Sequence, residues 1–201
     1  MNKPFKLIID NTLEFMFLFS NADAFYISAR YDLLHGWVVP GCSNAHQAIE
    51  LYIKAILKLN HEKEKGHNLI ALLQKYEKRD TYFKLILENP DIFELLQELS
   101  KAYLIFRYGE AGAESNSREI IQLIDELVFH LRRIYLRNIE SPSTKIFMSK
   151  YAKVDFLRDN KYFSEQDLTN NPIAQIGLPI GDDLPENFFN TALSKKGEVG
   201  I

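Results

Sequence analysis

Residues 45–59 of this 201-residue chain read AHQAIELYIKAILKL, and this stretch decides the fold class. Apolar residues recur in it every three or four positions, which is the spacing of one face of an α-helix. Asn44 and Gln47 suit the two positions of a capping box at its start. Because further leucines and isoleucines widen the apolar face, we expect this helix to be central in a helical bundle.

The same spacing predicts helices on both sides of this stretch, over residues 12–34, 67–76 and 81–88, from Pro90 to before Gly109, and along a last long helix that follows Asn116 and Glu119. Gly36 and the pair Pro40 and Gly41 are expected to end the first helix, since proline cannot continue one. Apolar residues from Ile120 to Ile134 alternate steps of four and three and predict a packing seam. Residues 1–140 are therefore predicted to form an all-α, up-and-down antiparallel bundle of about five helices.

The remaining residues, 141–201, have a different pattern. Four prolines and repeated Asn, Asp and Gly interrupt any helical spacing, although phenylalanines continue to occur. We expect an irregular C-terminal extension that packs its aromatic side chains on the bundle or on a dimer partner. Its last residues are expected to fray.

Composition restricts the partners and ligands of the chain. The net charge is only -3, so no overall field attracts nucleic acid or acidic lipid, and such a ligand needs a local patch. The single cysteine, Cys42, cannot form an internal disulfide and has no metal-ligand spacing around it. We find no secretory signal and no apolar run of about 18 residues. We therefore expect a cytoplasmic protein with no metal, no cofactor and no membrane partner.

Three stretches together, AHQAIELYIKAILKL (45–59), GHNLIALLQKY (66–76) and AYLIFRYGE (102–110), resemble the HEPN family in their order and spacing. The resemblance covers about residues 10–138. That family consists of helical bundles, usually dimeric, and includes RNases of toxin systems, partners of minimal nucleotidyltransferases and a nucleotide-binding module of sacsin. The resemblance therefore implies a homodimer with a nucleotide or RNA ligand, and a separate nucleotidyltransferase is a candidate partner.

Members of the family that cleave RNA carry an Arg and, four to six positions later, a His near the start of the last long helix. Arg107 has no His at that distance, so the resemblance implies binding without catalysis. The bare pattern occurs only at Arg30 and His35, where five residues of a regular helix would separate the side chains by about 140°. We interpret this pair as residues that bind the last carbonyls of the first helix. The alternative is a metal-independent RNase of a toxin–antitoxin type, in which Arg30 orients the phosphate and His35 moves a proton.

Phosphate binding needs fixed positive charge and hydrogen-bond donors, and an arginine supplies both. The resemblance points to Arg107 as a ligand-binding residue, with Tyr108 offering a ring for stacking, although Arg107 could instead pair with a nearby carboxylate. His67 is expected at the start of a short helix, whose free amides favour an anion, or serves as a neutral cap. Lys54 and Lys58 share one stripe of the central helix and face either the same cleft or solvent.

Arg132, Arg133 and Arg137 form the densest basic cluster in the chain, and RNA could contact such a cluster through its phosphates. The alternative is that these cations complement the dipole at the end of the last helix. Carboxylates such as Glu50 and Asp125 are interpreted as members of helix-surface pairs. A third hypothesis is purely structural, in which the apolar seam of the last helix builds a dimer that scaffolds another molecule.

Overall fold

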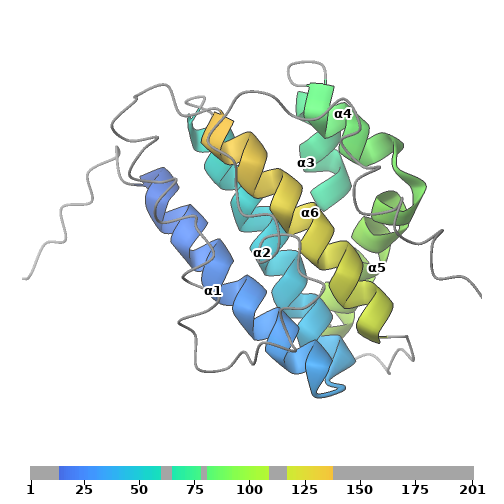
Figure 1. Cartoon of the computed structure of the whole chain (residues 1–201). Helices are drawn as coiled ribbons and strands as arrows, with labels where there is room; N and C mark the ends of the chain where they lie inside the picture. Colours follow the sequence, from blue (N-terminus) through green and yellow to red (C-terminus); the bar gives the residue numbers. More distant parts are fainter. Residues whose placement is uncertain (1–13, 60–64, 78–80, 109–116, 138–201) are drawn as a thin grey trace, which may run out of the picture.

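The computed structural model of the protein describes residues 14–59, 65–77, 81–108 and 117–137, and at 81, 106–108, 117–119 and 136–137 it describes the backbone alone. The regular structure in these ranges is entirely helical (Figure 1). Its elements in chain order are α1 (Glu14–Leu34), α2 (Val38–Leu59), α3 (Leu69–Tyr76), α4 (Thr81–Glu88), α5 (Pro90–Tyr108) and α6 (Ser117–Arg137). The predicted all-α class is confirmed, with six helices in place of about five.

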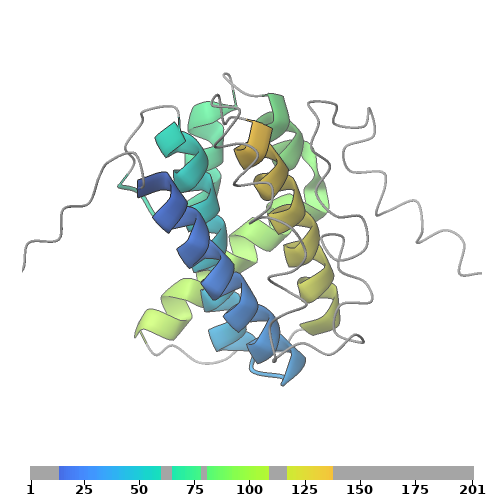
Figure 2. The same cartoon turned by 60° about the vertical axis from the view of Figure 1, so that its left-hand side comes forward.

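The three longest helices lie side by side along most of their length (Figure 1). α1 and α2 are antiparallel neighbours, and α6 runs antiparallel to α1 beside both. The shorter α3 and α4 lie together at one end, while α5 crosses the bundle obliquely (Figure 2). The helices enclose one core, in which Tyr26, Ile53, Leu73, Leu96 and Leu127 are buried.

The connection between α1 and α2 consists of residues 35–37 and is shorter than the roughly eight residues that Gly36, Pro40 and Gly41 predicted. Gly36, at φ 78°, ends α1, and its amide donates to the Leu33 carbonyl at 3.1 Å, while the Trp37 amide donates to the Asp32 carbonyl at 2.8 Å. This is the Schellman pattern of a glycine-terminated helix. α2 then begins at Val38, so the prediction that it begins at Asn44 was wrong.

Pro40 and Gly41, predicted to interrupt the chain, lie inside the first turns of α2. A proline is tolerated there because the first amides of a helix have no acceptor within the helix. Gly41 meets the neighbouring helix, since a Cβ at this position would lie 2.6 Å from Cγ of Leu33. Asn44 does not cap the helix, because its side chain donates to Asp32 at 2.8 Å.

Other sequence signals are confirmed where the structure describes them. Asn89 caps α5 by accepting from the Ile92 amide at 3.1 Å, and Pro90 is the first residue of that helix. The seam of α6 is buried within this chain, at Ile124, Leu127, Leu131 and Ile134. The seam is therefore part of the core of the bundle and not a dimer surface.

Two groups of predictions fall outside the described residues, namely the capping contact between Asn116 and the side chain of Glu119, and the extension over 141–201. Within the described ranges, none of the helices combines the length and apolar character that a membrane span requires.

Candidate functional site

The polar cluster with the most partners joins α2 to the segment before α3, and we call His46, Glu50, Lys54 and His67 the Glu50 cluster. Glu50 is buried on α2, one helical turn before Lys54, and its Oε1 accepts a hydrogen bond from Lys54 Nζ at 2.6 Å. Nδ1 of His67 lies 3.1 Å from each oxygen of the same carboxylate. A carboxylate thus holds two of the predicted ligand-binding residues in one place.

His46 connects this cluster to α5. It is buried one turn before Glu50, with Nε2 3.6 Å from Oε2 of that carboxylate. Its ring stacks on the ring of Tyr103, with centroids 4.3 Å apart and planes 6° apart. The Glu50 cluster therefore rests against α5 through an aromatic contact.

The charges of the cluster are balanced around the buried carboxylate. Burial alone would raise the pKa of Glu50, but the contacts with His46, Lys54 and His67 outweigh it and lower the pKa to about 2. Glu50 is therefore ionised at neutral pH and stays available as an acceptor. His67 remains open to solvent, with 60% of its side chain exposed, whereas the Lys54 side chain is mostly covered.

The start of α3 lies directly beside His67. Asn68 caps this helix by accepting from the Ala71 amide at 3.0 Å. The amides of Leu69 and Ile70 come before the first intrahelical acceptor, as at any helix start. Lys54, His67 and these amides bring positive charge and donors to one end of α3.

The family model described as the HEPN domain matches residues 15–134, which run from α1 into α6. The chain belongs to the HEPN family. This membership confirms the resemblance carried by the three helical stretches, and it suggests a nucleotide- or RNA-related function. No curated protein and no solved structure shows a significant match to the chain.

Other predicted residues of the HEPN domain lie elsewhere. Lys58 pairs with Glu14 of α1 at 2.5 Å, one turn beyond Lys54, and so joins α2 to α1 instead of the Glu50 cluster. Arg107 and Tyr108 belong to the last turn of α5, and Arg107 follows Tyr103 by one helical turn, but their side chains lie outside the described residues.

Arg30 and His35 contact different parts of the chain. Arg30 is buried and donates to Asp125 of α6, which also accepts from the Tyr26 hydroxyl at 2.6 Å. His35 is exposed, and its Nδ1 lies 2.7 Å from the Tyr31 carbonyl, so the prediction of a helix-end role is confirmed for this residue alone. Arg30 forms a buried ion pair with Asp125 of α6, which corrects the surface interpretation of Asp125.

The predicted basic patch of α6 is wrong at Arg132. This side chain is fully buried and donates to Asp23 of α1, which also accepts from the Tyr52 hydroxyl. Arg132 lies two helical turns after Asp125, so both share the stripe of α6 that faces the core. Arg133 is half-buried over the Phe129 ring at 5.5 Å, and the side chain of Arg137 is outside the described residues.

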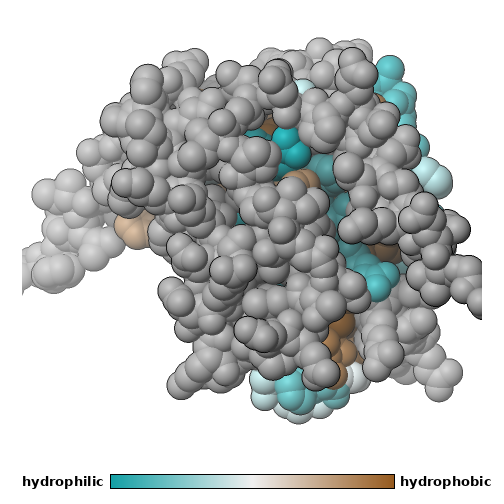
Figure 3. All heavy atoms as spheres, in the orientation of Figure 1, coloured by the Kyte–Doolittle hydropathy of each residue, from teal (hydrophilic) through white to brown (hydrophobic). Residues whose placement is uncertain are grey.

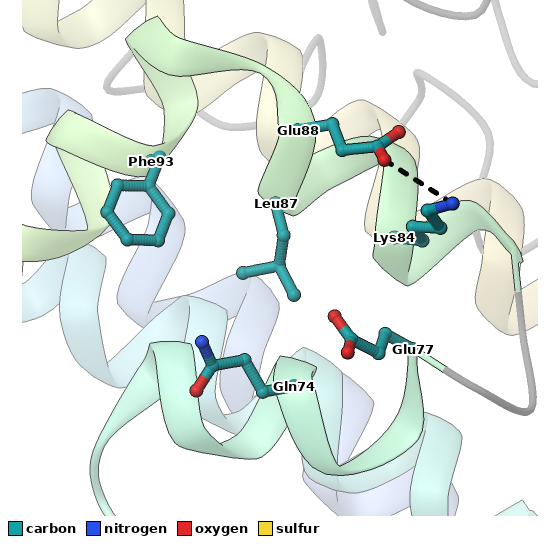
Figure 4. A pocket seen from close by; sticks show the side chains of 6 residues that line it. All are labelled: Gln74, Glu77, Lys84, Leu87, Glu88 and Phe93. Carbon is teal, nitrogen blue, oxygen red and sulfur yellow. Dashed lines mark ion pairs between the residues drawn. The ribbon is translucent and has the colours of Figure 1, made fainter.

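A hollow of about 460 Å³ lies between α3, α4 and α5 (Figure 4). Its lining includes the carboxylates of Glu77 and Glu88, and Lys84 pairs with Glu88 at 3.5 Å. Two carboxylates and one lysine leave the lining with a formal negative charge, which disfavours phosphate. Across the described ranges, no three His, Cys, Asp or Glu residues are grouped so that they could hold a metal ion.

Sequence reasoning missed Glu50, His46 and Tyr103 as members of this site. A signal was present, because His46, Glu50 and Lys54 follow one another at intervals of four and therefore share a face of α2. Their polar character suggested a solvent-facing stripe, but α3 and α5 cover that face.

Proposed function

We propose that this HEPN domain binds a nucleotide or RNA through a phosphate group at Lys54 and His67, without hydrolysing it. The observation that carries the proposal is the buried Glu50 carboxylate, which holds both side chains beside the start of α3. The family membership supports the ligand class.

The chemistry of the Glu50 cluster suits an anion. An ammonium group has three hydrogens, and the Glu50 oxygen accepts one of those of Lys54. A carboxylate only accepts hydrogen bonds, so Nδ1 of His67 carries a hydrogen, while 60% of the side chain stays exposed. The free amides of Leu69 and Ile70 add donors that a phosphate oxygen can use.

Glu50 also limits the strength of the site. Its negative charge offsets that of Lys54, so the pair is formally neutral and the phosphate gains mainly from oriented donors. Arg107 would supply the fixed charge that the cluster lacks, since it follows Tyr103 by one turn of α5 and Tyr103 stacks on His46. We therefore include Arg107 and Tyr108 in the proposed site.

We further propose that the domain is a homodimer, as is usual in its family, and that a separate nucleotidyltransferase is a candidate partner. The seam of α6 cannot be the dimer surface, because it is buried inside the chain. Light scattering of the full chain at micromolar concentration tests this proposal, and a mass of one chain would contradict it.

The RNase alternative needs Arg30 at a phosphate. Its guanidinium is buried against Asp125, so a ligand would have to break that ion pair to reach it. The described contacts therefore favour binding over catalysis. If the wild type cleaved RNA and the variants Arg30→Ala and His35→Ala lost this activity, catalysis would be favoured over binding.

Titration of the full chain with ATP, GTP and a short single-stranded RNA tests the binding proposal. We expect saturable binding of at least one ligand, weaker by about tenfold in His67→Ala, and no release of phosphate or RNA fragments. Absence of saturable binding by all three ligands would contradict the proposal.

A further inference from the structure

Three aromatic side chains meet on the turn between α1 and α2, and we call Tyr31, His35 and Trp37 the aromatic turn. The rings of Tyr31 and His35 lie 4.2 Å apart between centroids, and the Trp37 ring lies 6.2 Å and 6.1 Å from them. Trp37 is the single tryptophan of the chain, and 55% of it is exposed.

The backbone explains why Trp37 lies here but not why it is a tryptophan. In a Schellman turn, the residue after the glycine packs against the last turn of the helix, as Trp37 does on Tyr31. A leucine would satisfy that contact. A tryptophan that is 55% exposed offers a surface that can bind another ring or apolar group.

His35 adds a polar atom of defined character to this surface. A carbonyl oxygen only accepts, so Nδ1 of His35 carries the hydrogen that it donates to Tyr31 at 2.7 Å. In the neutral ring, Nε2 is then a hydrogen-bond acceptor on the opposite side of an exposed imidazole. The aromatic turn thus offers a ring face beside an acceptor.

We propose that the aromatic turn binds an unpaired nucleobase of RNA, which stacks on Trp37 and donates an N–H to Nε2 of His35. This inference rests on the proposed function, because it adds a second contact for the same class of ligand. The aromatic turn favours a base over a phosphate, because the charged side chain beside it is the carboxylate of Asp32, which repels phosphate and accepts a hydrogen bond from Asn44 at 2.8 Å.

The two sites are well separated. Trp37 precedes Glu50 by 13 positions, 12 of them within α2, which corresponds to about 20 Å along the helix axis at about 1.5 Å per residue. A mononucleotide can therefore occupy one site at a time. An RNA of several nucleotides that reached both would gain from the second contact.

The test uses the fluorescence of Trp37 and the anisotropy of a labelled single-stranded RNA as two separate readouts on the full chain. We expect unlabelled RNA to quench the tryptophan emission with the same midpoint as the anisotropy change. Trp37→Ala should weaken binding by about tenfold, and Trp37→Phe by less, because stacking persists. Phe17→Ala is the matched control, since Phe17 of α1 is also 55% exposed, and it should bind within about twofold of wild type.

An oligomer of the same length without bases separates base contacts from phosphate contacts. We expect it to bind wild type and Trp37→Ala equally and to leave the emission unchanged. RNA that binds by anisotropy without quenching, and equally well to Trp37→Ala, would overturn this inference and leave the proposed function intact. Absence of any anisotropy change would overturn both. Emission that changes with protein concentration but not with RNA would overturn the inference in favour of contact between copies of the chain.

Discussion

Asp125 accepts hydrogen bonds from Tyr26 and Arg30, and Asp23 accepts them from Tyr52 and Arg132. Burial raises the pKa of Asp125, and the Arg30 guanidinium counteracts it. A buried charge that loses its partner is costly, because neither water nor another ion replaces it. The two arginines therefore stabilise the fold mainly by pairing these carboxylates.

Removal of Arg30 should show this cost. We expect Arg30→Met to lower the free energy of unfolding by about 3–5 kcal/mol, because it leaves Asp125 buried and unpaired. The double variant Arg30→Met/Asp125→Leu should be less destabilised than Arg30→Met alone. Urea denaturation measures both effects.

A surface pair is the control for this prediction. Lys101 pairs with Glu98 at 2.6 Å with both side chains more than half exposed. Lys101→Met should change the free energy of unfolding by about 0.5 kcal/mol or less. If Arg30→Met and Lys101→Met lowered the free energy of unfolding equally, the buried pair would contribute no more to stability than the surface pair.

The pKa of Glu50 makes one contribution to stability depend on pH. The pKa of Glu50 is about 2 in the folded chain and 4.5 in its ordinary state, so between pH 2 and pH 4.5 this carboxylate binds a proton more readily in the unfolded chain. The contribution is therefore complete above about pH 4.5 and is lost as the pH falls toward 2. We expect the free energy of unfolding of wild type to exceed that of Glu50→Gln by about 3 kcal/mol at pH 7, and this difference to become smaller below pH 4.5.

Urea denaturation of both proteins from pH 7 to pH 3 measures the difference between their free energies of unfolding. Groups that titrate in both proteins contribute equally to the two values and cancel in this difference. Glu98→Gln is the matched control, because its carboxylate pairs with a lysine on the surface. A gap between wild type and Glu50→Gln that stayed constant down to pH 3 would contradict the role assigned to Glu50.

At the scale of the elements, α1 and α2 approach closely where Gly41 meets Leu33. A Cβ at position 41 would lie 2.6 Å from Cγ and 2.9 Å from Cδ2 of Leu33, and that side chain is buried. Gly41→Ala should therefore lower the free energy of unfolding by about 1–3 kcal/mol, in spite of the better helix propensity of alanine. Thermal or urea unfolding measures the change.

Gly66 is the matched control for Gly41. A Cβ at Gly66 would meet only Cδ2 of Leu72 at 3.9 Å, which is an ordinary contact. Gly66→Ala should be neutral or slightly stabilising. If Gly41→Ala were also neutral, the two helices would not be packed as closely as described.

The helices themselves could be predicted from the sequence wherever local signals act alone. Asn89 and Pro90 mark the start of α5, and Gly36 marks the end of α1, because a cap or a left-handed turn depends on a few adjacent residues. Pro40 and Gly41 misled the prediction because their role depends on the neighbouring helix. Proline fits a first turn, and glycine here allows close approach, which one segment alone does not reveal.

The interior polar contacts were harder to predict, because the partners are far apart in the chain. α1 contains Asp23 and Arg30, and α6 contains Asp125 and Arg132, so the acid and the base of each helix are seven positions apart. When two helices with this spacing run antiparallel, each acidic residue lies opposite an arginine of the other helix, which gives the pairs Arg30–Asp125 and Asp23–Arg132. The pattern is visible in the sequence, but its meaning requires knowing that α1 and α6 are neighbours.

Across the whole molecule, 24 lysines and arginines are outnumbered by 27 acidic residues, and the burial of Arg30 and Arg132 keeps these two arginines away from a nucleic-acid ligand. Binding of RNA should therefore depend on a small number of phosphate contacts and respond only weakly to salt. We propose the Glu50 cluster as one place where the described side chains make such contacts.

The most direct test of the Glu50 cluster compares RNA binding by Lys54→Gln and Lys84→Gln. Each lysine pairs with a glutamate four residues away, but Lys84 lies on the acidic hollow, and glutamine can still donate to Glu50. Anisotropy titrations of the full chain at several salt concentrations should show Lys54→Gln about tenfold weaker, with a salt dependence reduced by about one phosphate contact. Lys84→Gln should match wild type. Equal affinity and equal salt dependence for Lys54→Gln and wild type would contradict the proposed site.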